Sequence, residues 1–504
     1  MTPYFRTVAV LLSALALANT ARAQTPPDTL AQRLFAQAGE YLTSLYYGPS
    51  TLDLTALVAR YQAQLNTACT AQSAGCEYTV AEPIIAAMLA ELDDPHTFAL
   101  TPAELRADQA FSSGSSNSPA PRVGISMQFF CDTPTHACTY DRDGNPTTRW
   151  LPDRLITAVV PDSPAARAGV RVGDRFIGHN GALYASAANN EELLRLNNDF
   201  TARVRAGETV TMIVLRGSER ARLEIPVTGA IINNVVPPTL EVRSDGIGVL
   251  TISTFYIDGL GQRVHNLVRD ALERGARGLV VNMRDNSGGY IDEMMLTAGA
   301  LIETPPVIRY KTREDPRTTS ADMSYERTLG AVVFRTLGGE ETYRLGVKNQ
   351  QVFAGALAVL VNDWCMSSCE AVSSLVQRAR RGVVIGEETF GIGNTVYEPF
   401  ELMNGGSMGI TTARALWTDG MALPARVTPD IKTPDYAFVW FQTGVDAGMD
   451  AALKSVGGSS ASSTTSRLVS LNLARLPAFG GMDVLNAALE RTGAHAPSRA
   501  VAGW

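Results

Sequence analysis

Hydrophobic and polar positions follow patterns that divide the chain into blocks. In residues 24–110 the apolar residues recur with the period of amphipathic helices, as in LAQRLFAQAGEYLTSLYY, which predicts an N-terminal helical region. Residues 122–230 contain short apolar strands separated by turn dipeptides, and residues 231–454 alternate apolar strands with helical stretches. This alternation predicts an α/β core, so the expected fold class is multidomain, with α/β and α+β parts.

Two polar stretches lie at the boundaries of these blocks. The Ser/Pro-rich sequence FSSGSSNSPAP at 111–121 is typical of a linker between the helical region and the strand-rich domain. A Gly/Ser/Thr run at 457–466 lies within a stretch, 455–504, that is interpreted as a linker and a C-terminal appendage. The sequence predicts no function for this appendage.

The first 23 residues have the features of a secretory signal. Arg6 precedes an apolar run at 8–17, and Ala21-Arg22-Ala23 supplies a small-x-small cleavage pattern. The alternative is an uncleaved anchor. No later stretch approaches the roughly 18 apolar residues of a membrane span. We therefore expect an exported, soluble protein, either periplasmic or secreted.

Composition narrows the functional class. The chain has 504 residues, of which 45% are hydrophobic and 18% charged, as in an ordinary globular protein with more than one domain. Its formal net charge is −7, which opposes binding to nucleic-acid phosphates. We expect no nucleic-acid partner and no cofactor.

The six cysteines form three local pairs in the sequence, which are Cys69/Cys76, Cys131/Cys138 and Cys365/Cys369. In an oxidising compartment such pairs predict local disulfides. Metal binding is the weaker alternative, because only His136 lies close to a pair, and no metal site is predicted. At 365/369 two free thiols remain an alternative, since a bridge four residues apart strains regular helix geometry.

One segment, 359–391, combines a strand, a sharp turn, a helix and a second strand. A small hydroxyl residue at such a turn projects into solvent beside the amides of a helix N-terminus, which is the geometry of an acyl-transfer nucleophile. Ser367 occupies this position. The structural alternative is a serine that only caps the helix.

Part of the second block resembles a bacterial PDZ domain. The resemblance rests on ITAVVPDSPAARAGVRVGDRFIGHNG at 156–181. It implies a loop for a terminal carboxylate, formed by Arg122, Val123, Gly124 and Ile125, whose successive amides would bind the carboxylate while the next strand pairs with the peptide. The alternative is a glycine that merely relieves a turn. A polar insert at 127–155 departs from the pattern and is expected to cover or reshape the peptide groove.

The chain as a whole resembles the C-terminal processing, or tail-specific, serine peptidases. The matching motifs appear in the order of that family: LDDPHTF at 92–98, IGVL at 247–250, GLVVNMRDNSGG at 278–289, the serine cluster, IGEETFG at 385–391, TTAR at 411–414 and TPD at 428–430. The resemblance implies a ClpP/crotonase-like α/β core with Ser367 as nucleophile. It also implies that the Gly288-Gly289 turn and the Ser368 amide form the oxyanion hole.

The sequence departs from the best-known members of this family at the residue that serves them as the general base. They activate the serine with a lysine in a Phe-Gly-Lys-Gly stretch, whereas this chain has Ile392 between Gly391 and Gly393. Isoleucine cannot accept a proton, and a serine without a base is a poor nucleophile. His96, in Asp-Pro-His-Thr, resembles the histidine base of the tricorn-like branch of the superfamily and titrates near neutral pH. The alternative is a polar histidine at a helix end.

The sequence leaves the acid that orients His96 open, with Asp94, Asp419 and Glu398 as candidates. Two functions remain. One is an exported serine endopeptidase that acts on proteins or peptides with free C-termini. The other is a catalytically silent relative that binds peptide tails. The sequence predicts neither the physiological substrate nor the oligomeric state.

Overall fold

The computed structural model describes residues 29–106 and 121–459, except 73–74, 134–135, 137, 140–146, 233–235, 305, 315–316 and 434–435, and also residues 501–503. The predicted signal at 1–23, nearly all of the linker at 111–121 and most of the appendage at 455–504 lie outside the described residues. Those three assignments stay predictions.

The N-terminal region is helical, as predicted. It consists of α1 (Leu30–Leu45), α2 (Leu54–Thr70) and α3 (Tyr78–Ala90). Thr29 and Gln32 form a capping box at the start of α1, and the Cys69–Cys76 disulfide closes the α2–α3 connection. A strand interrupts the region: β1 (Phe98–Leu100) follows α3 and joins a sheet of the core, and residues 102–106 are helical again.

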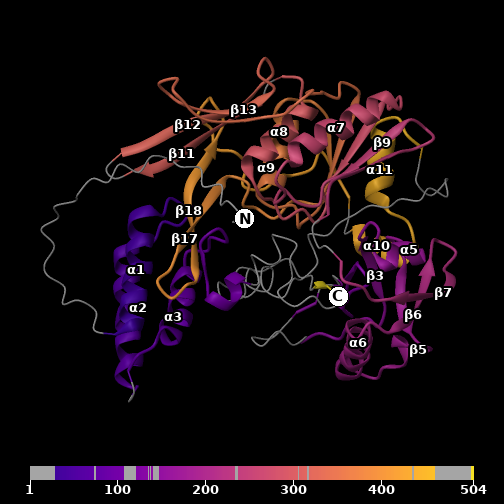
Figure 1. The fold of residues 1–504 in the computed structure, drawn as a ribbon, viewed down its shortest axis with the longest axis horizontal. Helices are drawn as coiled ribbons and strands as arrows, with labels where there is room; N and C mark the ends of the chain where they lie inside the picture. Colours follow the sequence, from indigo (N-terminus) through magenta and orange to yellow (C-terminus); the bar gives the residue numbers. More distant parts are fainter. Residues whose placement is uncertain are drawn as a thin grey trace, which may run out of the picture.

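The three helices pack on one end of a hairpin that comes from the far end of the chain. The hairpin consists of β17 (Thr395–Glu401) and β18 (Ser407–Leu416), and its buried Leu402, Met408 and Ile410 lie in the core of the helical region. Figure 1 shows α1–α3 beside this hairpin. Since β1 pairs antiparallel with β18, the segment just before β1 also lies beside this hairpin.

The second block is a small domain around its own hydrophobic core. Its elements are β2 (Ile125–Gln128), β3 (Arg154–Val159), α5 (Pro164–Ala168), β4 (Arg175–His179), β5 (Ala182–Leu183), the 3-10 turn Tyr184–Ser186, α6 (Asn190–Arg205), β6 (Thr209–Arg216) and β7 (Ala221–Thr228). The sheet order is β20-β2-β3-β4-β6-β7, where β20 (Val501–Gly503) pairs antiparallel with β2. The insert predicted at 127–155 is shorter than expected, because its first and last residues belong to β2 and β3.

The core contains a largely parallel sheet in the order β19-β16-β15-β10-β9-β8. Its strands are β8 (Thr239–Val242), β9 (Ile247–Thr251), β10 (Gly278–Asn282), β15 (Ala356–Val361), β16 (Val383–Gly386) and β19 (Ile431–Lys432). Its neighbouring helices are α7 (Leu260–Glu273), α8 (Ile291–Leu301), α9 (Ser368–Arg378) and α11 (Ala447–Ser455). This is the α/β alternation predicted from the sequence.

Both faces of this sheet are buried, because successive side chains point to opposite sides. Leu279, Val281 and Val359 pack with α7, α8 and α9, whereas Val280 and Leu360 pack with α11. Because β10 and β15 pair in parallel, their carboxyl ends meet at one edge of the sheet, where loops of parallel sheets usually carry their chemistry.

A second core sheet is antiparallel, in the order β1-β18-β11-β12-β13-β14 with β17 paired to β18. Its remaining strands are β11 (Val307–Glu314), β12 (Arg317–Glu326), β13 (Ala331–Thr336) and β14 (Glu341–Gly346). Helix α10 (Tyr436–Thr443) joins the core to the small domain, because Phe438 and Phe441 pack against Phe130 and Leu155.

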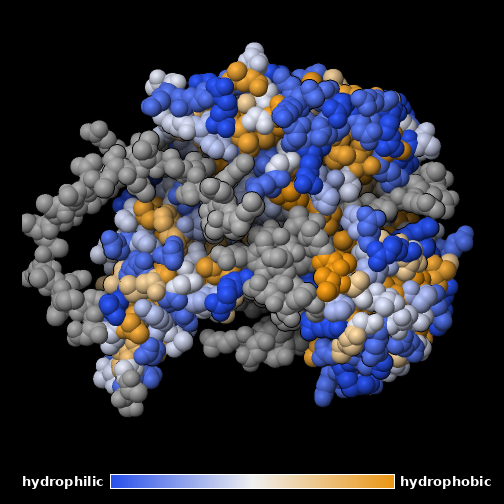
Figure 2. All heavy atoms as spheres, viewed as in Figure 1, coloured by the Kyte–Doolittle hydropathy of each residue, from blue (hydrophilic) through white to orange (hydrophobic). Residues whose placement is uncertain are grey.

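On the face drawn in Figure 2, hydrophilic residues predominate over the core and hydrophobic residues lie in scattered groups. Among the described residues, no helix combines the length and the apolarity needed to cross a membrane.

Candidate active site

Ser367 lies at the turn between a buried strand and a helix, as the sequence predicts. Strand β15 ends at Val361, helix α9 begins at Ser368, and Ser367 is the N-cap between them. Its φ of 51° and ψ of −114° are rare for a residue with a side chain. Such a conformation costs about 1–3 kcal/mol and persists only where its surroundings hold it, which is common at active sites.

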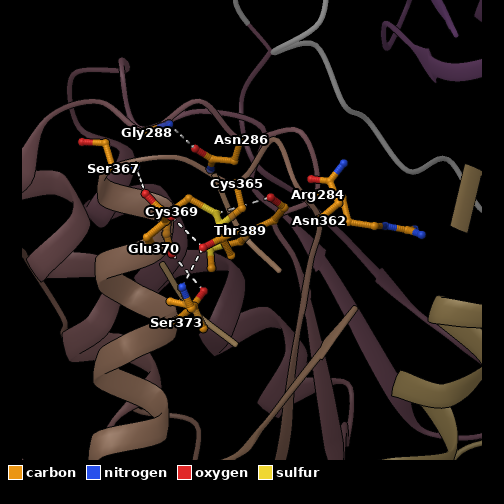
Figure 3. The surroundings of a disulfide bond; sticks show 12 residues. Arg284, Asn286, Gly288, Asn362, Cys365, Ser367, Cys369, Glu370, Ser373 and Thr389 are labelled. Atoms are coloured by element: carbon orange, nitrogen blue, oxygen red, sulfur yellow. Dashed lines mark hydrogen bonds between the residues drawn. A yellow bond between two sulfur atoms is a disulfide. The ribbon is translucent and has the colours of Figure 1, made fainter. Parts of the chain in front are cut away.

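Glu370 does much to keep Ser367 in this conformation. Its buried carboxylate accepts hydrogen bonds from the Ser367 amide (2.9 Å), the Gly391 amide (2.6 Å), the Ile392 amide (2.9 Å) and the Thr389 hydroxyl (2.6 Å). In Figure 3 the Ser367 side chain is directed away from this carboxylate. Glu370 thus ties the turn at Ser367 to the loop at 389–392, while the side chain of the half-buried Ser367 stays on the other side of the turn.

Burial also changes the acidity of Glu370. Desolvation raises the pKa of Glu370 to about 7, although the four hydrogen bonds favour the ionised form. The turn around Ser367 is therefore anchored by a group that titrates close to neutral pH.

A disulfide brackets the same turn. Cys365 and Cys369 are joined, with their Cα atoms 5.4 Å apart. The strain expected for a bridge within a helix does not arise, because α9 begins at Ser368 and Cys365 lies in the preceding turn. Cys131–Cys138 is also bridged. All three predicted disulfides are therefore confirmed, and the two-thiol alternative at 365/369 is wrong.

The Gly288-Gly289 turn lies directly against Ser367. Gly288 has a φ of 88°, and a Cβ placed on it would lie 2.8 Å from the Ser367 Cβ and 3.1 Å from the Ser368 nitrogen. A side chain at this position would therefore fill the space beside Ser367. The Ser368 hydroxyl donates to the Gly289 carbonyl at 2.7 Å and holds the two segments together.

The amides of this turn are not equivalent. The Gly288 N–H already donates to the Asn286 side chain at 2.8 Å, as Figure 3 shows. Within the described part of the chain, the amides of Gly289 and Ser368 make no hydrogen bond. The oxyanion hole predicted from the Gly288-Gly289 turn and Ser368 thus reduces to the amides of Gly289 and Ser368, with Gly288 providing the close approach.

Buried polar contacts fix the two loops at the sheet edge. Asn362 and Asp285 exchange two hydrogen bonds, of 2.6 and 2.7 Å, between the ends of β15 and β10. Arg284 makes a two-pronged buried ion pair with Asp446 at 2.8 and 2.9 Å. These contacts hold the glycine turn and the serine turn in register.

His96 comes to this region from the N-terminal region. It lies two residues before β1, and the pairing of Phe98 with Gly409 sets its segment beside the β17–β18 hairpin. Its Nδ1 is 2.7 Å from the Thr395 hydroxyl, and its ring lies 5.3 Å from that of Tyr397. Burial lowers the pKa of His96, and the charge of Asp94 opposes this shift. Buried and neutral at pH 7, the imidazole can accept a proton.

A short chain of contacts links His96 to the nucleophile turn. Thr395 Oγ1 lies 3.4 Å from the Ile392 carbonyl, and the Ile392 amide donates to the same Glu370 oxygen as the Ser367 amide. The isoleucine side chain itself packs with Trp364 and Met366 in a small apolar cluster. The position of the family's lysine is thus structural here.

The three candidate acids occupy different places. Asp94 accepts hydrogen bonds from the His96 main-chain amide (3.1 Å) and from the hydroxyls of Thr97 (3.0 Å) and Thr411 (2.7 Å). It therefore fixes the segment that carries the histidine. Asp419 pairs with Arg378 on the surface, and Glu398 is exposed on β17. None of the three makes a hydrogen bond to the His96 ring.

The four residues predicted to bind a peptide carboxylate lie in the small domain, in the segment that leads into β2. The Gly124 carbonyl accepts from the Val160 amide and the Val123 carbonyl from the Ala165 amide, which turns the loop around the start of α5. Gly124 has a φ of 81°, and a Cβ on it would lie 2.4 Å from the Ser163 Cβ, so glycine is required. Ile125 begins β2, and Arg122 pairs with Ala230.

The end of the insert between β2 and β3 contacts α6. Trp150 donates its amide to the Asn190 side chain at 2.9 Å, and Asn190 donates to the Thr148 carbonyl at 2.8 Å. The insert is thereby attached to the first turn of α6.

Sequence reasoning missed two residues of the site, Glu370 and Thr395. The first was recognisable, because Ser367 and Glu370 have the spacing of a capping box. The second had no local signal, since Thr395 and His96 are 299 residues apart in the chain.

Comparison with known proteins agrees with this geometry. A model for peptidase family S41 matches residues 246–433, and one for the PDZ domain matches residues 155–205. The core therefore matches peptidase family S41 over most of its length. Its match includes Ser367 and the glycine turn, while His96 lies before it. The small domain is a PDZ domain, as the motif at 156–181 predicted.

Curated relatives are distant. The "Probable CtpA-like serine protease" of Staphylococcus aureus (strain bovine RF122 / ET3-1) is 25% identical over 289 residues, which are 56% of this chain and 51% of the relative. Carboxyl-terminal-processing peptidase 2, chloroplastic, of Arabidopsis thaliana is 24% identical over 336 residues, which are 65% of this chain and 55% of the relative. The chain thus spans about half the length of the curated relatives it matches.

The multidomain fold also has solved counterparts. A protein of Bacteroides fragilis NCTC 9343 classed as an S41 protease aligns with a TM-score of 0.51 at 15% identity, covering 86% of this chain and 98% of that one. At this identity the likeness concerns the fold alone.

Proposed function

We propose that this chain is an exported serine endopeptidase that cleaves protein or peptide substrates through an acyl-enzyme at Ser367. The observation that carries the proposal is the geometry of Ser367, which has a φ of 51° at the N-terminus of α9 and lies against the Gly288-Gly289 turn. A serine that merely capped a helix would need neither this conformation nor the glycines beside it. Export rests on the signal-like first 23 residues and agrees with the three disulfides.

In the proposed mechanism, the Ser367 hydroxyl attacks the scissile carbonyl while His96 accepts its proton. The amides of Gly289 and Ser368 donate to the oxygen that becomes negative, where preorganised donors are most effective. His96 then returns the proton to the leaving amine, and an acyl-enzyme remains on Ser367. Water, deprotonated by the same imidazole, hydrolyses this ester.

We further propose that the PDZ domain recruits substrates by their free C-termini. In this proposal the amides of the loop after Arg122, at Val123, Gly124 and Ile125, bind the carboxylate, and the peptide pairs with the edge of β2 that β20 occupies in this structure. Amidation removes the charge that these amides solvate, so amidated peptides should bind more weakly.

The alternative is a silent relative that binds peptide tails without cleaving them. One observation favours it, because the position of the family's lysine is occupied by Ile392 in an apolar cluster. The two functions are distinguished by incubating the purified wild-type chain, Ser367→Ala and Ser368→Ala with a mixture of unstructured peptides and identifying the products by mass.

The endopeptidase proposal expects cleavage by wild type, a loss of several orders of magnitude in Ser367→Ala and a smaller loss in Ser368→Ala. Activity in Ser367→Ala combined with none in Ser368→Ala would move the nucleophile by one residue. A wild type that binds peptide tails and cleaves nothing would support the silent relative.

A further inference from the structure

A histidine base needs a partner on its second ring nitrogen. That partner fixes which nitrogen carries the proton and how the ring is oriented. The carboxylates considered from the sequence do not fill this role, because Asp94 is used by the His96 amide and by two threonine hydroxyls. The partner that the ring does have is the hydroxyl of Thr395, at 2.7 Å from Nδ1.

The surroundings of Thr395 are compatible with a hydrogen bond in which the ring donates, because they offer the hydroxyl a second acceptor. A hydroxyl has one proton to donate, and the Ile392 carbonyl, 3.4 Å from Oγ1, is an acceptor only. When the hydroxyl donates to that carbonyl, its lone pair faces Nδ1, and Nδ1 must carry the proton. The other nitrogen, Nε2, then keeps its lone pair and can act as a base.

Thr395 is also placed where it can fix the position of the His96 ring. It is the first residue of β17, directly after the loop whose Gly391 and Ile392 amides are bound by Glu370. Glu370 binds the Ser367 amide as well. Thr395 therefore connects the segment that carries the base to the carboxylate that holds the nucleophile turn.

We propose that Thr395 is a positioning residue that holds His96 in the Nδ1–H tautomer, in the role that a carboxylate has in a Ser-His-Asp triad. The tautomer is a property of the folded chain, and only its catalytic consequence rests on the proposed function. A neutral hydroxyl stabilises the imidazolium less than a carboxylate does, while Asp94 acts on the ring through its charge alone.

The test compares Thr395→Val, which keeps the shape and removes the hydroxyl, with Thr395→Ser, which restores it. Thr201→Val is the matched control, because this buried threonine of the PDZ domain donates only to a carbonyl of its own helix, at 2.9 Å. Each protein is labelled with ¹⁵N-histidine, the His96 signals are assigned by their loss in His96→Gln, and peptide hydrolysis is measured in parallel.

We expect a protonated Nδ1 and an unprotonated Nε2 in wild type, a mixture of tautomers in Thr395→Val, and wild-type signals in Thr395→Ser and Thr201→Val. In Thr395→Val, kcat should fall roughly 10- to 100-fold with little change in KM, as for the loss of a hydrogen bond to a charged group. Thr395→Ser should recover most of that loss.

A proton on Nε2 in wild type, or ring signals and kcat unchanged in Thr395→Val, would overturn the assignment. The outcome also separates the two proposals. If wild type cleaves no peptide but its ring signals respond to Thr395→Val and recover in Thr395→Ser, Thr395 positions the ring and the endopeptidase proposal fails.

Discussion

The substitution Glu370→Gln tests how the nucleophile turn is held. Glu370 receives four donors, two on each carboxylate oxygen. Glutamine keeps the size of the side chain but offers one oxygen, and its NH₂ group meets two donors. Each donor left without an acceptor costs about 1–3 kcal/mol, so Glu370→Gln should destabilise the core by about 2–6 kcal/mol.

This destabilisation should depend on pH in a definite direction. The pKa of Glu370 is about 7 in the folded chain against an ordinary value of 4.5, so the folded state binds the proton more tightly. The contribution of this group to stability is complete below pH 4.5 and is lost as the pH rises through 7. With about 1.4 kcal/mol per pH unit between the two values, the loss amounts to about 3 kcal/mol. Glutamine does not titrate, so Glu370→Gln should be more destabilising at pH 5 than at pH 8, by about 2–3 kcal/mol.

Urea unfolding of both proteins at pH 5 and pH 8 measures this difference. Unfolding is monitored by tryptophan fluorescence, to which the buried Trp364 beside the site contributes. At each pH the free energy of unfolding of the variant is compared with that of wild type, so the contributions of the other titrating groups cancel. Glu388→Gln is the control, since Glu388 is an exposed residue that pairs with Lys432. Equal destabilisation at both pH values, or a larger destabilisation at pH 8, would refute the raised pKa of Glu370. Full peptide hydrolysis by Glu370→Gln would refute its role at Ser367.

Three further predictions follow from the same contacts. The His96 ring should titrate below the ordinary pKa of 6.5, because burial lowers it, and a transition above 6.5 in ¹⁵N-histidine spectra would contradict this. Replacing Cys365 and Cys369 by serine removes a bridge of sequence separation 4 and should cost about 2 kcal/mol in urea unfolding; an unchanged midpoint would assign the bridge no part in stability. Free-acid peptides with an apolar last residue should bind more tightly than their amides by fluorescence anisotropy, whereas equal affinities would argue against the loop around Gly124 as a carboxylate site.

Much of the architecture was predictable because it rests on local patterns. The apolar run at 359–361, the serine cluster and the following helix gave strand β15, the turn at Ser367 and helix α9. Closely spaced cysteines gave the three disulfides, because residues seven or four apart meet with little loss of chain entropy. The PDZ domain followed from its helix and turn residues.

What remained unpredictable depends on distant pairing and on burial. The partner of His96 is decided by the register of β1 on β18, which no local pattern specifies. The hydrogen bond from the Gly288 amide to Asn286 depends on how one loop folds back on itself, and it removes that amide from the predicted oxyanion hole. Likewise, Glu370 is recognisable as a cap, but its pKa of about 7 arises from complete burial.

The central claim is that Ser367 is a nucleophile activated by His96, and labelling with a fluorophosphonate tests it most directly. Mass spectrometry of the labelled chain should locate the adduct on Ser367, and His96→Ala should slow its formation roughly 100-fold or more, as for removal of a general base. No adduct, an adduct on another residue, or an unchanged rate in His96→Ala would contradict the claim.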